Sequence, residues 1–343
     1  MKTTVALLVL AAIAALAPYP EWVIERQYSN GIYPVWQRTI TPLTNLLPVA
    51  VLDVLLVLAL ALLAGGFVRG ARRRGRRAAM ARLGVWIARG AAVTYLLFLA
   101  SWGLNYQRVP LRAKLDFERE RISQERAIRL ASVAVERLNA GHAAAHATPL
   151  REESLAYAFF DAQHALGSAR FIEPGRPKRS LLQWYFRWAA INGMTVPGAL
   201  EIILNPDLLK VEVPATLAHE WAHLAGYADE SEANFLAWLT CVRSGDPLAQ
   251  YSAWLDAYGL AAGALPRPLR ATLPRLEEGP RQDLRDIAAR YERSSPRVRD
   301  AAREVYDAYL RAHRVEDGIR SYGVVLQLML GTRFEENWTP ALR

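Results

Sequence analysis

Cysteine is nearly absent from the sequence: Cys241 is the only one among 343 residues. A disulfide within the chain is therefore impossible, and we interpret Cys241 as a small buried side chain. Acidic residues are absent between Arg69 and Arg82, a stretch that contains seven arginines. The formal net charge is +9, and 9 − 7 leaves only +2 for the rest of the chain. The positive charge is thus a local feature.

The arginine-rich stretch also lacks the interleaved aromatic residues of many nucleic-acid surfaces, so the sequence predicts no nucleic-acid partner. It lies between two apolar runs, 49–68 and 85–104, each long enough to cross a lipid bilayer. A short basic loop between membrane helices is expected on the cytoplasmic side, where it attracts anionic headgroups. Asp53 and Arg89 lie near the ends of these runs, and we predict that they anchor the helices at the interfaces.

A shorter apolar run, 3–17, begins the chain. Ala15-Leu16-Ala17 resembles a signal-peptide cleavage site, but Pro18 disfavours cleavage, so we predict an uncleaved membrane helix, with a cleaved signal peptide as the alternative. The predicted organisation within the cytoplasmic (inner) membrane has spans at 1–20, 46–68 and 84–104. An interfacial segment at 21–45 and a domain at 105–343 lie outside the cytoplasm, and a cytoplasmic loop lies at 69–83.

The most informative motif is His-Glu-x-x-His at 219–223. On a helix, positions i and i+4 lie on one face about 6 Å apart along the axis, so His219 and His223 can bind one metal ion. Glu220 lies at the edge of that face, where it reaches a water molecule on the metal. The pattern predicts a Zn²⁺ site for metal-assisted hydrolysis, with Glu220 as the general base.

A catalytic zinc usually has a third protein ligand, which we expect from the next helix. Gly226 suits the end of the first helix and Asp229 suits the N-cap of the second. Glu232, three residues later, completes a capping box with Asp229, which leaves Glu230 as the ligand. Asn234, one turn after Glu230, is predicted to hold the outer nitrogen of a ligating histidine.

The run His219-Glu220-x-x-His223-x-x-Gly226-Tyr227-Ala228-x-Glu230-x-Glu232-Ala233-Asn234-Phe235 resembles an uncharacterised family of bacterial membrane proteins with a zincin-like domain. Trp102-Gly103-Leu104-Asn105-Tyr106 and Ser321-Tyr322-Gly323 also resemble its pattern, so the likeness covers most of the chain. The site is similar to that of gluzincin metallopeptidases, whose third ligand is a glutamate, and this implies Glu230. The gap from His223 to Glu230 is shorter than in many gluzincins. The fold we expect is three transmembrane α-helices followed by a mainly helical α+β zincin-like domain.

Three weaker predictions complete the site. The β-type run Glu201-Ile202-Ile203-Leu204-Asn205 is a candidate edge strand that pairs with an extended substrate, with an ordinary sheet strand as the alternative. Tyr322, before the last apolar helix, is a candidate oxyanion donor, with a core tyrosine as the alternative. His142 and His146 are also spaced i, i+4, but their segment is Ala-rich, has no carboxylate between them and runs into an expected loop at 143–149, so we interpret it as a solvated linker.

The function predicted from these residues is a membrane-anchored zinc metallopeptidase that hydrolyses a peptide or protein substrate on the outer side of the membrane. One alternative is a non-catalytic envelope protein with a structural zinc, which a fourth protein ligand would favour. The other is a zinc hydrolase of cell-wall amides, because the sequence does not separate these substrates.

Overall fold

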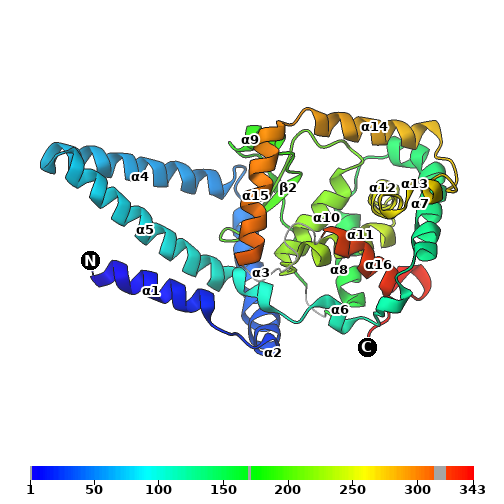
Figure 1. The fold of residues 1–343 in the computed structure, drawn as a ribbon, viewed down its shortest axis with the longest axis horizontal. Coiled ribbons are helices and arrows are strands. Elements are labelled where there is room, and N and C mark those ends of the chain that lie inside the picture. The colour runs from blue at the N-terminus through cyan, green and yellow to red at the C-terminus, as the bar shows by residue number, and fades with distance from the viewer. Residues whose placement is uncertain (1, 169–170, 313–321) are drawn as a thin grey trace.

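The computed structural model of the chain describes residues 2–168, 171–312 and 322–343. Figure 1 shows a mostly helical body from which three helices, α1, α4 and α5, project on one side. The N-terminal and membrane-type helices are α1 (Lys2–Leu16), α2 (Glu21–Val23), η1 (Ile24–Ile32), α3 (Tyr33–Asn45), α4 (Val51–Arg74), α5 (Arg76–Ser101) and η2 (Gly103–Gln107). The body contains α6 (Leu111–Lys114), η3 (Arg119–Arg121), α7 (Gln124–Ala147), α8 (Glu152–Ala165), β1 (Pro177–Lys178), α9 (Gln183–Ala189), β2 (Gly193–Val196), β3 (Glu201–Leu204), α10 (Val213–Leu224), α11 (Glu230–Arg243), α12 (Pro247–Ala264), α13 (Arg267–Arg270), α14 (Glu278–Glu292), α15 (Pro296–Ala312), α16 (Tyr322–Gly331) and η5 (Glu336–Trp338).

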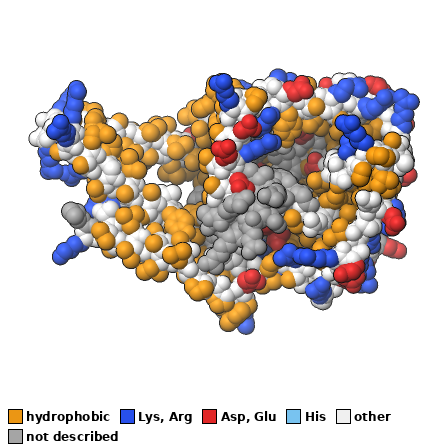
Figure 2. Space-filling model, in the orientation of Figure 1, with side chains coloured by type: hydrophobic (Ala, Val, Ile, Leu, Met, Phe, Trp, Pro, Cys, Tyr) orange, Lys and Arg blue, Asp and Glu red, His pale blue; other side chains and the backbone are white. Residues whose placement is uncertain are grey.

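Two helices of the described chain, α4 and α5, are long and apolar enough to cross a membrane. A third crossing is reached if α1 and the helical stretch Glu21–Asn45, which are bent by 101° against each other, form one broken span. Hydrophobic side chains cover the projecting helices in Figure 2, and Lys and Arg side chains gather at their far tip. The structure differs from the predicted loop at 69–83, because both helices continue through the arginines and reverse at Gly75. Its φ of +83° is one that glycine adopts without strain.

The segment between α1 and α4 is helical almost throughout, as α2, η1 and α3. One face packs on the body: the Tyr33 hydroxyl donates to the carbonyl of Leu224 at 2.8 Å, and Gln37 donates to Glu173 O at 2.7 Å. Trp22 and Trp36 on this segment are exposed. The segment therefore contributes both to the domain core and to an exposed aromatic surface.

The N-terminus of α4 is bound tightly to the body by two buried carboxylates. Glu201 accepts hydrogen bonds from the backbone N–H groups of Val51 and Leu52, each at 2.9 Å, and pairs with Lys178 at 2.7 Å. Asp53 accepts from the Ser180 hydroxyl at 2.7 Å. Because the first N–H groups of a helix have no partner within it, Glu201 satisfies donors that would be costly in an apolar environment, whereas Asp53 links the first turn of α4 to residues 180 and 181.

The sheet has three short strands in the order β1-β3-β2. β1 runs parallel to β3, and β2 runs antiparallel to it with Thr195 opposite Ile202. The candidate edge strand at 201–205 is therefore wrong, because β3 occupies the centre and both of its sides are hydrogen-bonded. The strand at the outer edge next to α10 is β2.

The helices of the body pack around α10, α11 and α12, whose apolar residues form the centre of the core. α7 packs along α12, and it continues to Ala147, so the predicted loop at 143–149 is also wrong for most of its length. His142 and His146 consequently lie on a helix. α15 runs beside α9 in front of the body in Figure 1.

Candidate metal centre

α10 places the His-Glu-x-x-His motif inside the body. The helix begins with Pro214 in its first turn and ends before Gly226, whose φ of +81° confirms the predicted C-cap glycine. A side chain at this position would meet Asn105, since an added Cβ would lie 2.9 Å from its Oδ1. Trp221, on the opposite side of α10 from the motif's polar groups, packs edge-on against Phe159 in the core. The buried face fixes the rotation of α10 and hence the direction of its two histidines.

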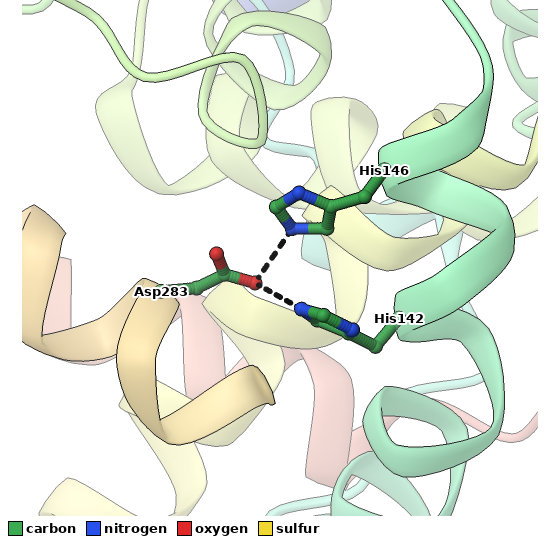
Figure 3. Close-up of side chains that lie close together, drawn as sticks. All are labelled: His142, His146 and Asp283. Carbon is green, nitrogen blue, oxygen red and sulfur yellow. Dashed lines mark hydrogen bonds and ion pairs between the residues drawn. The ribbon is translucent and has the colours of Figure 1, made fainter. Parts of the chain in front are cut away.

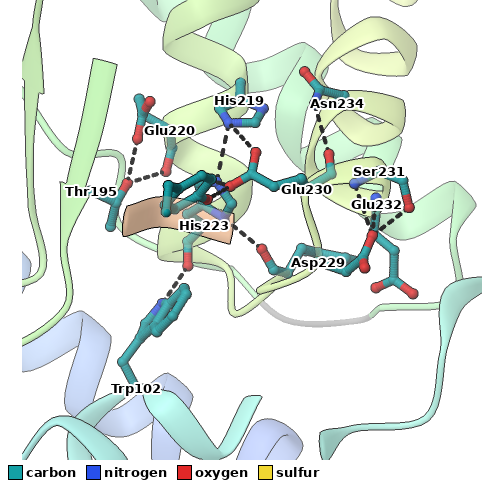
Figure 4. Close-up of polar contacts among 12 residues, drawn as sticks. Trp102, Thr195, His219, Glu220, His223, Asp229, Glu230, Ser231, Glu232 and Asn234 are labelled. Atoms are coloured by element: carbon teal, nitrogen blue, oxygen red, sulfur yellow. Dashed lines mark hydrogen bonds and ion pairs between the residues drawn. The ribbon is translucent and has the colours of Figure 1, made fainter. Parts of the chain in front are cut away.

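The side chains of His219, His223 and Glu230 meet at one point between α10 and α11 (Figure 4). The two Nε2 atoms are 3.1 Å apart, and the Glu230 oxygens lie 3.4 Å from His219 Nε2 and 3.5 Å from His223 Nε2. Tetrahedral zinc with bonds of about 2.0–2.1 Å places neighbouring ligand atoms about 3.3 Å apart. The three separations are close to this edge length, and the two to Glu230 involve different oxygens, Oε2 toward His219 and Oε1 toward His223.

The backbone decides which nitrogen of His223 faces this point. His223 Nδ1 lies 2.7 Å from the carbonyl oxygen of Tyr227, and a carbonyl only accepts, so Nδ1 carries the hydrogen. In the neutral ring Nε2 then presents a lone pair to Glu230 and His219. Trp102, at the end of α5, donates its indole N–H to the His223 carbonyl at 2.9 Å and holds this turn in place.

Glu230 is the first residue of α11. Asp229 is the N-cap, as predicted, and accepts from the N–H groups of Ser231 and Glu232. The hydroxyl of Tyr306 on α15 donates to Glu230 Oε1. This contact from a residue 76 positions later fixes the rotation of the carboxylate and was not predicted from the sequence.

The site's electrostatics follow from burial and from the closeness of its charges. Burial alone would raise the pKa of Glu230, but His223 and His219 outweigh it and hold that pKa well below the usual value. Burial alone would lower the pKa of His223, whereas the Glu230 carboxylate raises it to about 9. Burial raises the pKa of Glu220 above that of an exposed carboxyl. Three electron-pair donors therefore converge on a point that needs a proton or a cation, and two imidazoles with a carboxylate are ligands that suit zinc.

Two neighbouring residues have other roles than the predicted ones. Glu232 does not return to Asp229 to complete a capping box. Its carboxylate accepts from the backbone N–H of Leu111 at 2.5 Å, and burial and Asp229 raise its pKa to about 7. Asn234 donates to the backbone oxygen of Glu230 at 2.7 Å, so it does not hold a histidine nitrogen. Both side chains are therefore engaged with backbone groups and do not contact a histidine.

Glu220 is positioned by β2. The Thr195 hydroxyl lies 2.8 Å from Glu220 Oε2 and 3.0 Å from the Glu220 backbone oxygen. Gly193 on the same strand leaves space for the carboxylate, since an added Cβ would lie 2.5 Å from Glu220 Oε1. β2 therefore both orients the carboxylate and approaches it closely.

The remaining predicted residues lie elsewhere. Of the run 201–205, Glu201 caps α4, Ile202 and Ile203 are buried in the core, and Asn205 donates to Ile191 O at 2.8 Å. Leu204 pairs with Gly193 across the sheet. The side chain of Tyr322 lies outside the described residues. β2 is the edge strand beside Glu220, and Tyr306 contacts Glu230, although neither carried a motif in the sequence.

Residues 28–330 match the family described as a protein of unknown function (DUF3810), and the chain belongs to that family. No curated protein and no solved structure matches the chain. The resemblance to gluzincins therefore depends on the residues of the site itself.

Proposed function

We propose that this member of a family of unknown function is a membrane-anchored zinc metallopeptidase that acts outside the cytoplasm. The observation that supports the proposal most directly is the convergence of His219, His223 and Glu230, with Glu220 beside them on the same helix turn. His219, His223 and Glu230 would hold the zinc ion. When bound, zinc would act as a Lewis acid that lowers the pKa of water to about 7 and polarises a carbonyl.

Glu220 is the residue we propose to move the proton. Its raised pKa brings the carboxylate nearer to neutral pH, where a group both accepts and returns a proton efficiently. Thr195 donates to Oε2, which leaves Oε1 as the oxygen for water. The carboxylate would take a proton from the attacking water and give it to the leaving amine. Tyr306 would act as a positioning residue for Glu230.

The substrate would bind along β2. This strand has β3 on one side only, and its backbone passes Glu220. An extended peptide that adds to a sheet edge gains main-chain hydrogen bonds whatever its sequence. A peptide paired with β2 would carry its backbone carbonyls past the metal centre, which favours peptide bonds as the target.

The anchor we propose consists of α4 and α5 together with the broken span of α1 and Glu21–Asn45. The arginines at the far tip of α4 and α5 would lie in the cytoplasm and the body on the outer side. A reporter enzyme fused after Arg76 is expected to report cytoplasm and one fused after Arg343 the outside. A cytoplasmic C-terminus would contradict this topology.

The catalytic part is tested with Glu220→Gln in the full-length chain. The amide keeps the size of the side chain but accepts no proton, so metal content should hold while turnover falls at least about 10²-fold. Substrates are found by comparing new N-termini in the envelope proteomes of wild-type and variant strains, and each cleavage is repeated with purified protein. Glu136→Gln, a carboxylate change at an exposed position of α7, is the matched control for expression.

Three results would lead to different conclusions. Equal cleavage by the Glu220→Gln protein with unchanged metal content would show that Glu220 is not the base. Bound zinc with no cleavage that depends on Glu220 would favour the structural-zinc alternative. Cleavage of cell-wall amides instead of peptides would identify the other hydrolase class.

A further inference from the structure

A second group of metal-ligating side chains lies between α7 and α14. His142 and His146 of α7 face Asp283 of α14, and one ligand atom from each lies within 4.8 Å of the others. Figure 3 shows both imidazole rings directed at the same carboxylate oxygen. Asp283 Oδ2 is 3.1 Å from His146 Nε2 and 3.6 Å from His142 Nε2. We propose that these three residues form a second binding site for a transition-metal dication, with Zn²⁺ as the expected ion.

The distances fit such an ion. The distances from Asp283 Oδ2 to the two histidine nitrogens, 3.1 Å and 3.6 Å, lie on either side of the roughly 3.3 Å expected between neighbouring ligand atoms of tetrahedral zinc. The two rings are 4.3 Å apart between centroids, so a small movement of either brings both nitrogens to one ion. Two imidazoles and a carboxylate are borderline-hard ligands, which favour zinc over the oxygen-seeking Mg²⁺ and Ca²⁺.

The opposite helix, α14, leaves space for the ring of His142. Gly279 lies one turn before Asp283 on α14, and a Cβ added there would lie 2.5 Å from Cε1 of His142. Any other residue at 279 would therefore displace the ring from its place beside Asp283. A His–Asp contact on a solvated surface would not require this space.

The carboxylate is held in position by a residue that a metal ion would not replace. The buried Tyr251 of α12 donates its hydroxyl to Asp283 Oδ2, the kind of outer hydrogen bond that orients metal ligands. Asn139, one turn before His142, binds the chain leading into α14: it donates to Arg275 O at 3.0 Å and accepts from Glu277 N at 2.8 Å. The two helices are thus fixed relative to each other without the ion.

The exposed fractions indicate an open coordination position. The side chain of Asp283 is 9% exposed, whereas those of His142 and His146 are 30% and 42% exposed. A metal ion would have three protein ligands on the inner side and water on the outer side. Such an ion would cross-link α7 to α14, and the expected effect of binding is slower opening of α14.

The proposal does not rest on the function of the first centre, and it is tested in the full-length protein in detergent. Metal-free protein is loaded with excess Zn²⁺, desalted and analysed for zinc per chain, and the absorption of a Co²⁺-loaded sample is recorded. We expect about two ions in the wild type and about one less in His142→Ala/His146→Ala. His164→Ala, which removes an exposed histidine from α8, is the matched control and should bind as the wild type does.

The variant His219→Ala/His223→Ala separates the two centres. If only the second site exists, the wild type binds one ion and this variant retains it, whereas His142→Ala/His146→Ala binds none. Asp283→Asn provides a milder change that keeps the size of the side chain, and its affinity for Zn²⁺ at this site should fall at least about tenfold. Hydrogen exchange of residues 278–292 should slow on zinc addition in the wild type and in His219→Ala/His223→Ala, but not in His142→Ala/His146→Ala or Asp283→Asn. Equal zinc content and equal affinity in wild type, His142→Ala/His146→Ala and Asp283→Asn would overturn the proposal.

Discussion

The protonation of His223 provides a quantitative test of the candidate metal centre. Beside Glu230 its pKa rises to about 9, so in neutral solution the metal-free ring carries a proton on the nitrogen that faces the ligand point. A metal ion must displace that proton, and the apparent affinity therefore increases with pH up to about pH 9. Since the shift comes from Glu230, the same carboxylate controls both the affinity and its pH dependence.

The size of the effect follows from the pKa. Between pH 8 and pH 6 the displaced proton alone should weaken zinc binding about a hundredfold, because each unit below the pKa costs a factor of about ten. An imidazole with the ordinary pKa of about 6.5 would give a fall of only about fourfold over this range. In Glu230→Gln the attraction that raises the pKa is gone and burial lowers it. We therefore expect weaker binding at pH 8 and a much shallower pH dependence.

The assay is competition against a coloured zinc chelator at pH 6, 7 and 8, corrected for protonation of the chelator. Using His142→Ala/His146→Ala as the parent protein removes the proposed second site from the measurement. Calorimetry at pH 7.5 in two buffers with different ionisation enthalpies should count about one proton released by His223. An affinity that falls tenfold or less between pH 8 and pH 6 with Glu230 present would refute this account of the centre.

Three further changes test neighbouring residues. Thr195→Val removes a hydrogen bond worth about 1.5–3 kcal/mol to a charged group, so the acid limb of the pH–rate profile should move up by about 1–2 pH units. Thr195→Ser keeps the hydroxyl and should leave the limb in place. An unmoved limb in both variants would mean that Thr195 does not affect the pKa of Glu220. Glu232→Gln should keep its zinc, because the amide oxygen still accepts from Leu111 N; loss of zinc would show that this side chain is a ligand. Glu201→Ala should lower the free energy of unfolding by about 3–5 kcal/mol, because it leaves the buried Lys178 unpaired. Asp161→Ala, which removes an exposed partner of Arg243, should lower it by less than about 1 kcal/mol. Equal losses would contradict the anchoring role of Glu201.

What could be predicted from the sequence is what depends on local geometry. His219 and His223 are one helical turn apart, and Glu230 follows after a turn that Gly226 and Asp229 define. These positions are related by a few backbone angles, so a pattern of residue types is enough to place them together. The apolar lengths of α4 and α5 could be predicted for the same reason.

Two of the predictions that were wrong, those for the run 201–205 and for His142 and His146, depend on partners far away in the chain. The run 201–205 has the composition of a strand, but whether a strand is central depends on its neighbours. Here those are the two-residue β1 and the glycine-containing β2, neither of which has a strand pattern. His142 and His146 meet an aspartate about 140 positions later, and Tyr306 reaches back 76 positions to Glu230. An alternating or i, i+4 pattern contains no information about such contacts.

The boundary at residue 105 that the apolar runs suggested is crossed by contacts with α10, the helix that carries His219 and His223. Trp102 donates to the carbonyl of His223, and Tyr33 donates to that of Leu224, so two consecutive residues of α10 are held by residues that precede the boundary. Glu201, on the strand next to β2, is in turn bound to the start of α4. A chain cut at 105 would leave two buried carbonyls without their donors and Glu201 without its helix, each costing about 1–3 kcal/mol. The helices before residue 105 are therefore part of the framework that positions the site, and its chemistry has to be measured on the full chain.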